Sequence, residues 1–148
     1  MTDNRRKGKD GENEAARLWR RWFPNARRSF GQARRGYEQP DILHCKPFYI
    51  EVKRCATEPT KNKLKKWWNK LIEDWVKFEK LNGDHDTWEP VLVWRVDCGR
   101  WQIGMYGTLA NQLSSLADVE DDVWYTTTWE SFARSMDEIY PIHNGGSG

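Results

Sequence analysis

The chain has 148 residues, and its 24 lysine and arginine residues against 22 aspartate and glutamate residues give a net charge of +2. This length suits one domain with a single core. The first residues are polar and the sequence has no long apolar run, so we expect a cytoplasmic protein of a cell or an infected host, not a membrane or secreted one. Three cysteines without a CxxC pair favour neither a disulfide framework nor a structural zinc site.

Charge is distributed unevenly along the chain. Residues 1–81 hold 21 lysine and arginine against 11 aspartate and glutamate residues, a net charge of +10, whereas residues 82–148 hold 3 against 11, a net charge of −8. The basic half predicts contact with a polyanion such as nucleic acid, which its field attracts and its cations hold through phosphates. Solvated helix faces are the plainer alternative.

The first predicted elements are a basic flexible tail at residues 1–8 and a helix over residues 10–23, capped by Asp10. Glu12 shares the inward face of this helix, whereas Glu14 is expected to face solvent. Glu12 is therefore the candidate functional carboxylate, unless it is an ordinary first-turn glutamate favoured by the helix dipole. The apolar stripe of the helix consists of Ala15, Leu18, Trp19 and Trp22.

A strand over residues 26–30 and a polar, arginine-rich loop over residues 31–39 come next, followed by two short apolar strands. In the second of these, Glu51 and Lys53 point to one face because side chains alternate along a strand. Asp41, which the preceding strand brings in, supplies a second carboxylate. Two carboxylates and a lysine on adjacent strands suit a magnesium-dependent phosphodiesterase. An exposed cross-strand salt bridge is the alternative for Glu51 and Lys53.

The remaining elements follow from periodicity and turn signals. We expect an amphipathic helix over residues 63–81 and a hairpin of residues 90–96 and 100–106 around residues 97–99. A helix over residues 108–116, a short strand over 123–126 and a helix over 129–136 complete the pattern. Residues 143–148 are predicted to be a second flexible tail. The alternation of strands and helices predicts an α/β fold with a mixed sheet of about five strands.

The residues Pro40-Asp41, nine intervening residues and Glu51-Val52-Lys53 resemble the signature of the PD-(D/E)XK nucleases. The stretch "KGKDGENEAARLW" resembles the first helix of the archaeal and phage Holliday junction resolvases, in which a glutamate at the position of Glu12 binds metal. The stretches "ARRSFG" and "EPVLVWRVDCGRWQIGM" resemble a later segment and the final hairpin of that family. Together these similarities cover residues 7–105.

The resemblance implies a restriction-endonuclease-like sheet flanked by helices, with residues 9–142 as a single nuclease domain. It implies a Mg²⁺-dependent endodeoxyribonuclease, in which Mn²⁺ would substitute, with the catalytic residues Glu12, Ser29, Asp41, Glu51 and Lys53. The implied metal ligands are Glu12, Asp41, Glu51 and the carbonyl of Val52. The implied DNA contacts are Lys7, Lys9, Arg28, Arg34, Arg35 and Arg54. The loop at residues 31–39 departs from the family pattern because it is longer and richer in arginine.

The implied substrate is a four-way DNA junction, cut by paired nicks during recombination and repair. Because such a junction has near-two-fold symmetry, the expected partner is a second copy of the chain in a homodimer. Three alternatives stay open: a flap, nicking or repair endonuclease of the same superfamily, a non-catalytic DNA-binding protein of the same fold, and an RNA-binding protein.

Overall fold

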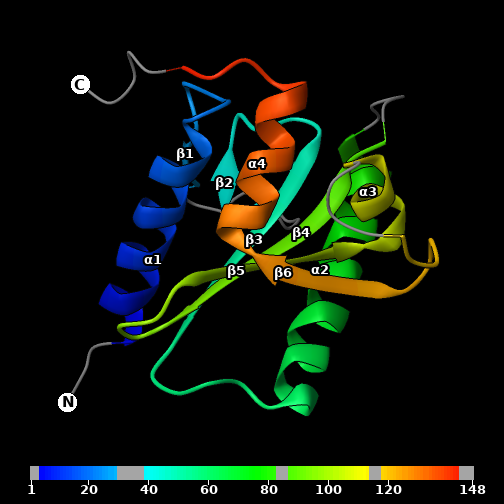
Figure 1. Cartoon of the computed structure of the whole chain (residues 1–148). Helices are drawn as coiled ribbons and strands as arrows, with labels where there is room; N and C mark the ends of the chain where they lie inside the picture. The colour runs from blue at the N-terminus through cyan, green and yellow to red at the C-terminus, as the bar shows by residue number, and fades with distance from the viewer. Residues whose placement is uncertain (1–3, 30–38, 83–86, 114–117, 144–148) are drawn as a thin grey trace.

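The computed structural model describes residues 4–29, 39–82, 87–113 and 118–143 and has an α/β architecture (Figure 1). Its helices are α1 (Asn4–Trp19), α2 (Lys61–Asn82), α3 (Gly107–Gln112) and α4 (Trp129–Ile139). Its strands are β1 (Arg27–Arg28), β2 (Ile42–Leu43), β3 (Phe48–Cys55), β4 (Glu89–Val96), β5 (Trp101–Tyr106) and β6 (Trp124–Thr128).

The strands form a mixed four-stranded sheet and a separate pair. The sheet has the order β3-β4-β5-β6, with β3 parallel to β4 and the other neighbours antiparallel. Helix α2 makes the crossover that a parallel pair requires. The prediction of one sheet of about five strands was therefore wrong in detail. The antiparallel strands β1 and β2 have only two residues each and stand beside β3 as their own ladder.

Helices cover both faces of the sheet, as Figure 1 shows. Helices α1 and α4 pack on the face that carries Phe48, Ile50 and Val52, together with Trp19 and Phe132. Helix α2 packs on the opposite face, with a cluster consisting of Tyr49, Leu71, Phe78, Leu92 and Trp94 and the flanking Trp67, Trp68 and Trp75. The alternation predicted for residues 48–53 is thus confirmed, and so is the apolar face of α2. Each large apolar side chain buried in this way contributes about 1.5–3 kcal/mol.

The boundaries of the first helix differ from the prediction. Helix α1 begins at Asn4, inside the segment predicted as a flexible tail, and Asp10 lies within the helix and does not cap it. A tertiary contact accounts for the longer helix, because Lys7 Nζ lies 2.6 Å from Asp97 Oδ2 in the turn between β4 and β5. At the other end, residues after Trp19 form turns, and the backbone N–H of Phe23 donates to Trp19 O at 3.0 Å.

Hydroxyl side chains begin two of the other helices. Thr60 Oγ1 accepts from the backbone N–H of Lys63 before α2, and Thr128 Oγ1 accepts from that of Ser131 before α4. The β4–β5 turn closes with Gly99 N donating to Val96 O, and Cys98 adopts a left-handed conformation with φ of 61°. None of the described helices is long and apolar enough to cross a membrane.

Candidate active site

Asp41 lies against the edge of β3 that faces away from β4. Its backbone N–H donates to Ile50 O at 2.8 Å, and its Oδ2 accepts from the backbone N–H of Val52, also at 2.8 Å. These two bonds go to the residues on either side of Glu51, so Asp41 and Glu51 are directly adjacent. Because the N–H and C=O of one strand residue point to the same side, the Val52 carbonyl also points to the edge that Asp41 occupies.

Glu51 and Lys53 project from β3 on the face that α2 covers, since they alternate with residues packed against α1. Lys53 Nζ lies 3.7 Å from Glu51 Oε1, and the side chains are 34% and 17% exposed. The salt bridge that was the plainer alternative is therefore present. It is compatible with a site, however, because a lysine held beside a half-buried carboxylate can also reach a bound anion.

Glu12, on α1, is paired with a cation. Its Oε2 accepts from Arg28 Nε at 2.9 Å, and the two side chains are 24% and 18% exposed. Arg28 belongs to β1 and is opposite Ile42, the residue after Asp41. The structure thus brings Glu12 and Arg28 together beside the two-stranded ladder.

Ser29 follows Arg28 and lies next to Asp41. Its backbone N–H donates to Asp41 O at 2.8 Å. Its hydroxyl is buried and has no hydrogen-bond partner in the described part of the chain. A buried hydroxyl without a partner is costly, so this serine is a polar group beside Asp41 that the described contacts do not explain.

The six predicted DNA contacts have different surroundings. Lys7 and Arg54 are engaged with carboxylates inside the protein, and Arg28 is paired with Glu12. Lys9 is exposed on α1. Arg34 and Arg35 lie outside the described residues. Exposed cations are instead abundant on α2, whose lysines Lys61, Lys63, Lys65, Lys66, Lys70, Lys77 and Lys80 are all exposed.

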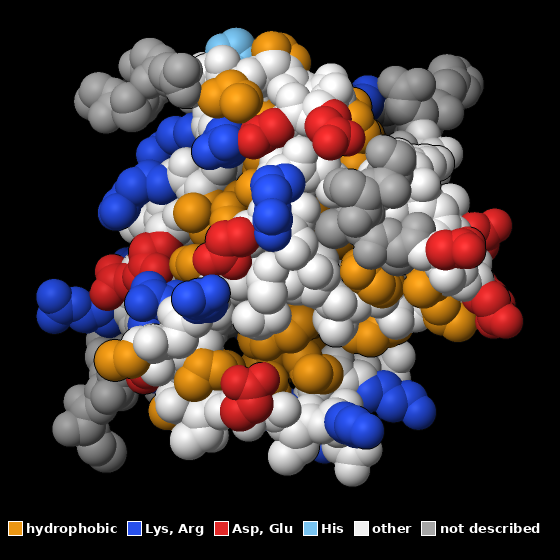
Figure 2. Space-filling view, viewed as in Figure 1, with side chains coloured by type: hydrophobic (Ala, Val, Ile, Leu, Met, Phe, Trp, Pro, Cys, Tyr) orange, Lys and Arg blue, Asp and Glu red, His pale blue; other side chains and the backbone are white. Residues whose placement is uncertain are grey.

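Basic and acidic side chains are partly segregated on the surface. Figure 2 shows basic and acidic side chains interspersed over α1, and a group of acidic side chains at the opposite edge near the start of β6. This group lies in the segment before β6, which holds the exposed residues Asp118, Glu120, Asp121 and Asp122.

Glu14 is the residue that sequence reasoning misplaced. It was expected to face solvent, but its carboxylate lies 2.8 Å from Arg54 Nη1 and 2.6 Å from Arg95 Nη1. Arg54 also pairs with Asp97, at 3.0 Å. These partners come from three distant segments, so local periodicity carries no sign of them. The one available signal was Gly11, an unusual residue for the middle of a helix.

The donor set fits a hard cation such as Mg²⁺ only in part. Mg²⁺ takes oxygen ligands, keeps several waters and is often held by one or two carboxylates. Asp41 and Glu51, with the Val52 carbonyl, supply such ligands at one edge. Within the described residues, however, no group of three or more His, Cys, Asp or Glu side chains is close enough to hold a metal ion. The carboxylate of Glu12 is instead paired with Arg28.

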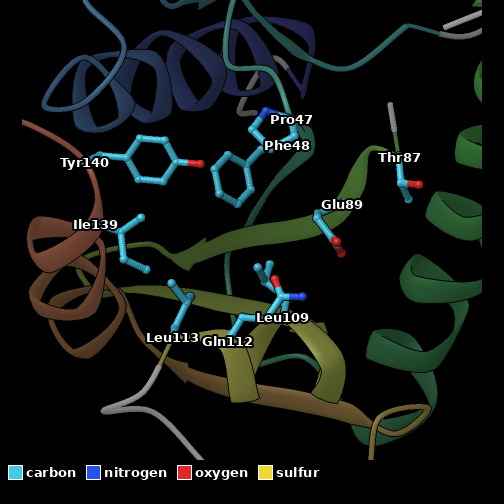
Figure 3. Close-up of a pocket in the computed structure, with 9 residues that line it drawn as sticks. All are labelled: Pro47, Phe48, Thr87, Glu89, Leu109, Gln112, Leu113, Ile139 and Tyr140. Atoms are coloured by element: carbon cyan, nitrogen blue, oxygen red, sulfur yellow. The ribbon is translucent and has the colours of Figure 1, made fainter. Parts of the chain in front are cut away.

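A small cavity of about 160 Å³ lies elsewhere, where β3 and β4 begin and α3 and α4 end (Figure 3). Its lining is mostly apolar, with Phe48, Leu109, Leu113 and Tyr140 around it and Glu89 on one wall. Burial, with a smaller repulsion from Glu79, raises the pKa of Glu89. None of the candidate site residues lines this cavity.

None of the known protein-family models matches this chain, and no curated protein or solved structure matches it either.

Proposed function

We propose that the chain is a Mg²⁺-dependent, structure-selective DNA endonuclease of the Holliday junction resolvase type, with a restriction-endonuclease-like fold. The observation that carries this proposal is the placement of Asp41, whose bonds to Ile50 and Val52 set its carboxylate beside Glu51. Lys53 lies beside the same pair, 3.7 Å from Glu51. Partly buried charge is costly, and a functional role would explain why Asp41, Glu51 and Lys53 gather at one strand edge.

In the proposed reaction, water forms a bond to phosphorus, one ester P–O bond breaks, and a proton passes to the departing oxygen. A magnesium ion, when bound, would lower the pKa of a coordinated water and neutralise charge on the phosphate oxygens. Asp41, Glu51 and the Val52 carbonyl would hold it, and Glu12 would join them after leaving Arg28. Lys53 would orient the attacking water and stabilise negative charge developing on the phosphate. Ser29, with its unpartnered hydroxyl, would donate a hydrogen bond to a phosphate oxygen.

The rest of the molecule would hold and steer the DNA. The exposed lysines of α2 cover the face on which Glu51 and Lys53 lie, and they would attract the phosphate backbone. Arg34 and Arg35 are also proposed as phosphate contacts. Two copies related by a two-fold axis would match the symmetry of a four-way junction and make two nicks.

A decisive experiment incubates the purified protein with a labelled four-way junction, with and without Mg²⁺. Flap, nicked, linear and single-stranded substrates are treated in parallel, and the Asp41→Asn variant controls for contaminating nucleases. Paired symmetric nicks on the junction alone are the expected result. Cleavage of flaps or nicked duplexes in preference would instead favour another nuclease of the superfamily. Light scattering should find a dimer, and a monomer on bound junction would contradict the resolvase proposal.

A second candidate is a DNA-binding protein that retains the fold without the activity. The pairing of Glu12 with Arg28 favours it, since that carboxylate is committed to a cation and not to a metal site. This candidate predicts tight, salt-dependent junction binding with no Mg²⁺-dependent product at any enzyme concentration.

A further inference from the structure

A network of charged side chains joins α1 to the end of β3 and the β4–β5 turn. Arg54 is its centre, with Nη1 lying 2.8 Å from Glu14 Oε1 and Nη2 lying 3.0 Å from Asp97 Oδ1. Each carboxylate has a second cation, because Lys7 Nζ lies 2.6 Å from Asp97 Oδ2 and Arg95 Nη1 lies 2.6 Å from Glu14 Oε2. The side chain of Arg54 is only 13% exposed. Charge-assisted bonds in such partly buried places are stronger than surface ion pairs.

Gly11 makes room for this network. A Cβ added to Gly11 would lie 2.4 Å from Arg54 Cγ and 3.4 Å from Arg54 Cδ, so the aliphatic stem of Arg54 crosses α1 where a side chain is missing. Gly8, one turn earlier on the same helix, would place its Cβ in open space with nothing within 4 Å. Glycine lowers helix stability relative to alanine at either position. The close approach of Arg54 therefore explains the glycine at position 11, whereas no such contact explains Gly8.

Gly11 and Arg54 are each next to a candidate site residue in the sequence. Gly11 directly precedes Glu12 on α1, and Arg54 directly follows Lys53 on β3. On β3, Arg54 points to the face covered by α1, whereas Lys53 points to the face covered by α2. The crossing of Arg54 over Gly11 thus sets how α1 lies against the strand that carries Glu51 and Lys53.

We propose that Arg54 is a positioning residue that, by packing over Gly11 and binding Glu14 and Asp97, fixes Glu12 relative to Lys53 at the edge of β3. This inference rests on the proposed nuclease function. It gives Arg54 and Lys7 a role inside the protein in place of the DNA contacts predicted from the sequence. A shift of about 1 Å in a catalytic group costs on the order of a hundredfold in rate, so the loss of this positioning should slow cleavage measurably.

The first test needs neither metal nor DNA. Amide hydrogen exchange of α1 is measured for the wild-type chain, Gly8→Ala, Gly11→Ala, Arg54→Met and the double variant Gly11→Ala/Arg54→Met. We expect exchange between Gly8 and Ala15 to rise at least about tenfold in Gly11→Ala and Arg54→Met, because the helix opens locally when its contact is lost. Gly8→Ala, which makes the same chemical change in open space, should exchange no faster than the wild type.

The double variant tests whether the two residues act through one contact. If they do, Gly11→Ala adds little to Arg54→Met, because the guanidinium that the new Cβ would displace from Glu14 and Asp97 is already absent and the unanchored methionine can move aside. Arg54→Met leaves each carboxylate with its second cation, so the chain is expected to remain folded. Equal exchange in Gly8→Ala and Gly11→Ala, or fully additive effects in the double variant, would overturn the inference.

The second test uses junction cleavage at varied Mg²⁺. We expect Gly11→Ala and Arg54→Met to lower kcat at least about tenfold and to raise the Mg²⁺ concentration for half-maximal rate, with junction affinity within about twofold. Turnover equal to the wild type would show that α1 needs no such positioning. An equal loss of junction affinity would overturn the inference and would favour the sequence-based prediction that Arg54 contacts DNA. Absence of cleavage by the wild-type chain would remove the nuclease proposal itself, and hydrogen exchange would then decide the placement of α1.

Discussion

The carboxylate of Asp41 accepts a hydrogen bond from the backbone N–H of Val52 at 2.8 Å and thereby takes the place of a strand neighbour at the edge of β3. Val52 is only 8% exposed, so its N–H has little access to water. One carboxylate oxygen of Asp41 is thus committed to the fold. In the proposed site, the negative charge of Asp41 would serve a ligand beside Glu51.

The role of the Asp41 carboxylate in the fold and its role in the proposed site can be separated by comparing two substitutions at this position. Asp41→Asn keeps an oxygen that can accept from Val52, so its free energy of unfolding in urea should stay within about 1 kcal/mol of the wild type. Asp41→Ala leaves a buried N–H unsatisfied and should cost about 1–3 kcal/mol. Both variants should lose Mg²⁺-dependent cleavage, because both lose the charge. Cleavage by Asp41→Asn at the wild-type rate would remove Asp41 from the site.

We predict that Lys53 contributes to the chemical step of cleavage more than to DNA binding. It lies beside Glu51 and is about one third exposed, so its ammonium can reach a phosphate without being buried by the fold. Lys53→Ala should abolish cleavage while junction affinity, measured by fluorescence anisotropy, changes by less than about threefold. Lys46→Ala, which removes an exposed lysine from the turn before β3, is the matched control and should cleave normally. A similar loss in both variants would point to general electrostatics instead.

Most elements of this fold were predictable from local pattern. The alternation of Phe48 to Lys53 predicted the two faces of β3, and the helical spacing of tryptophans predicted the buried face of α2. The hairpin around residues 97–99 was also predicted correctly. These features depend on neighbours within one or two turns, and the sequence displays them directly.

The errors came from contacts between distant segments. Helix α1 starts early because Lys7 meets Asp97, 90 residues away, and Glu14 turns inward because Arg54 and Arg95 lie beneath it. The division of the strands into two sheets has the same origin, since Asp41 bonds to β3 once through its backbone N–H and once through its side chain, where a regular strand would use its backbone for both. Periodicity holds no information on such pairings.

The ion pair between Arg28 and Glu12 makes a prediction about metal affinity. Arg28 Nε donates to Glu12 Oε2 at 2.9 Å. If Glu12 is a ligand, the metal must displace this cation and also bind against its positive charge. Arg28→Met should therefore tighten Mn²⁺ binding, on the order of three- to tenfold, because both opposing effects disappear. Electron paramagnetic resonance of free Mn²⁺ measures this without any reaction.

Arg27→Met provides the control, since Arg27 is the exposed neighbour of Arg28 on the same short strand. It removes the same charge without touching Glu12 and should leave Mn²⁺ binding nearly unchanged. Equal Mn²⁺ affinity in Arg28→Met and the wild-type chain would show that Glu12 does not reach the metal. The proposed site would then consist of Asp41 and Glu51 alone.

Glu89, on the wall of the small cavity, predicts how stability depends on pH. Burial, with repulsion from Glu79, raises the pKa of this carboxyl above the ordinary value of 4.5. The folded chain therefore holds a proton that the unfolded chain has already lost, so folding loses stability as pH rises from 4.5 through the raised pKa. Glu89→Gln has no charge to bury. It should be more stable than the wild type at pH 7 and equally stable below pH 4.5.

Urea unfolding from pH 4 to pH 8 measures this difference, and Glu138→Gln on the exposed side of α4 controls for the general loss of one negative charge. The stability gain of Glu89→Gln over that control should appear between pH 4.5 and neutrality and then stay constant. A gain that is the same at every pH would mean that packing, and not the buried charge, distinguishes the two side chains. A loss at pH 7 would mean that the Glu89 carboxylate has a stabilising partner, which burial and the neighbouring Glu79 do not supply.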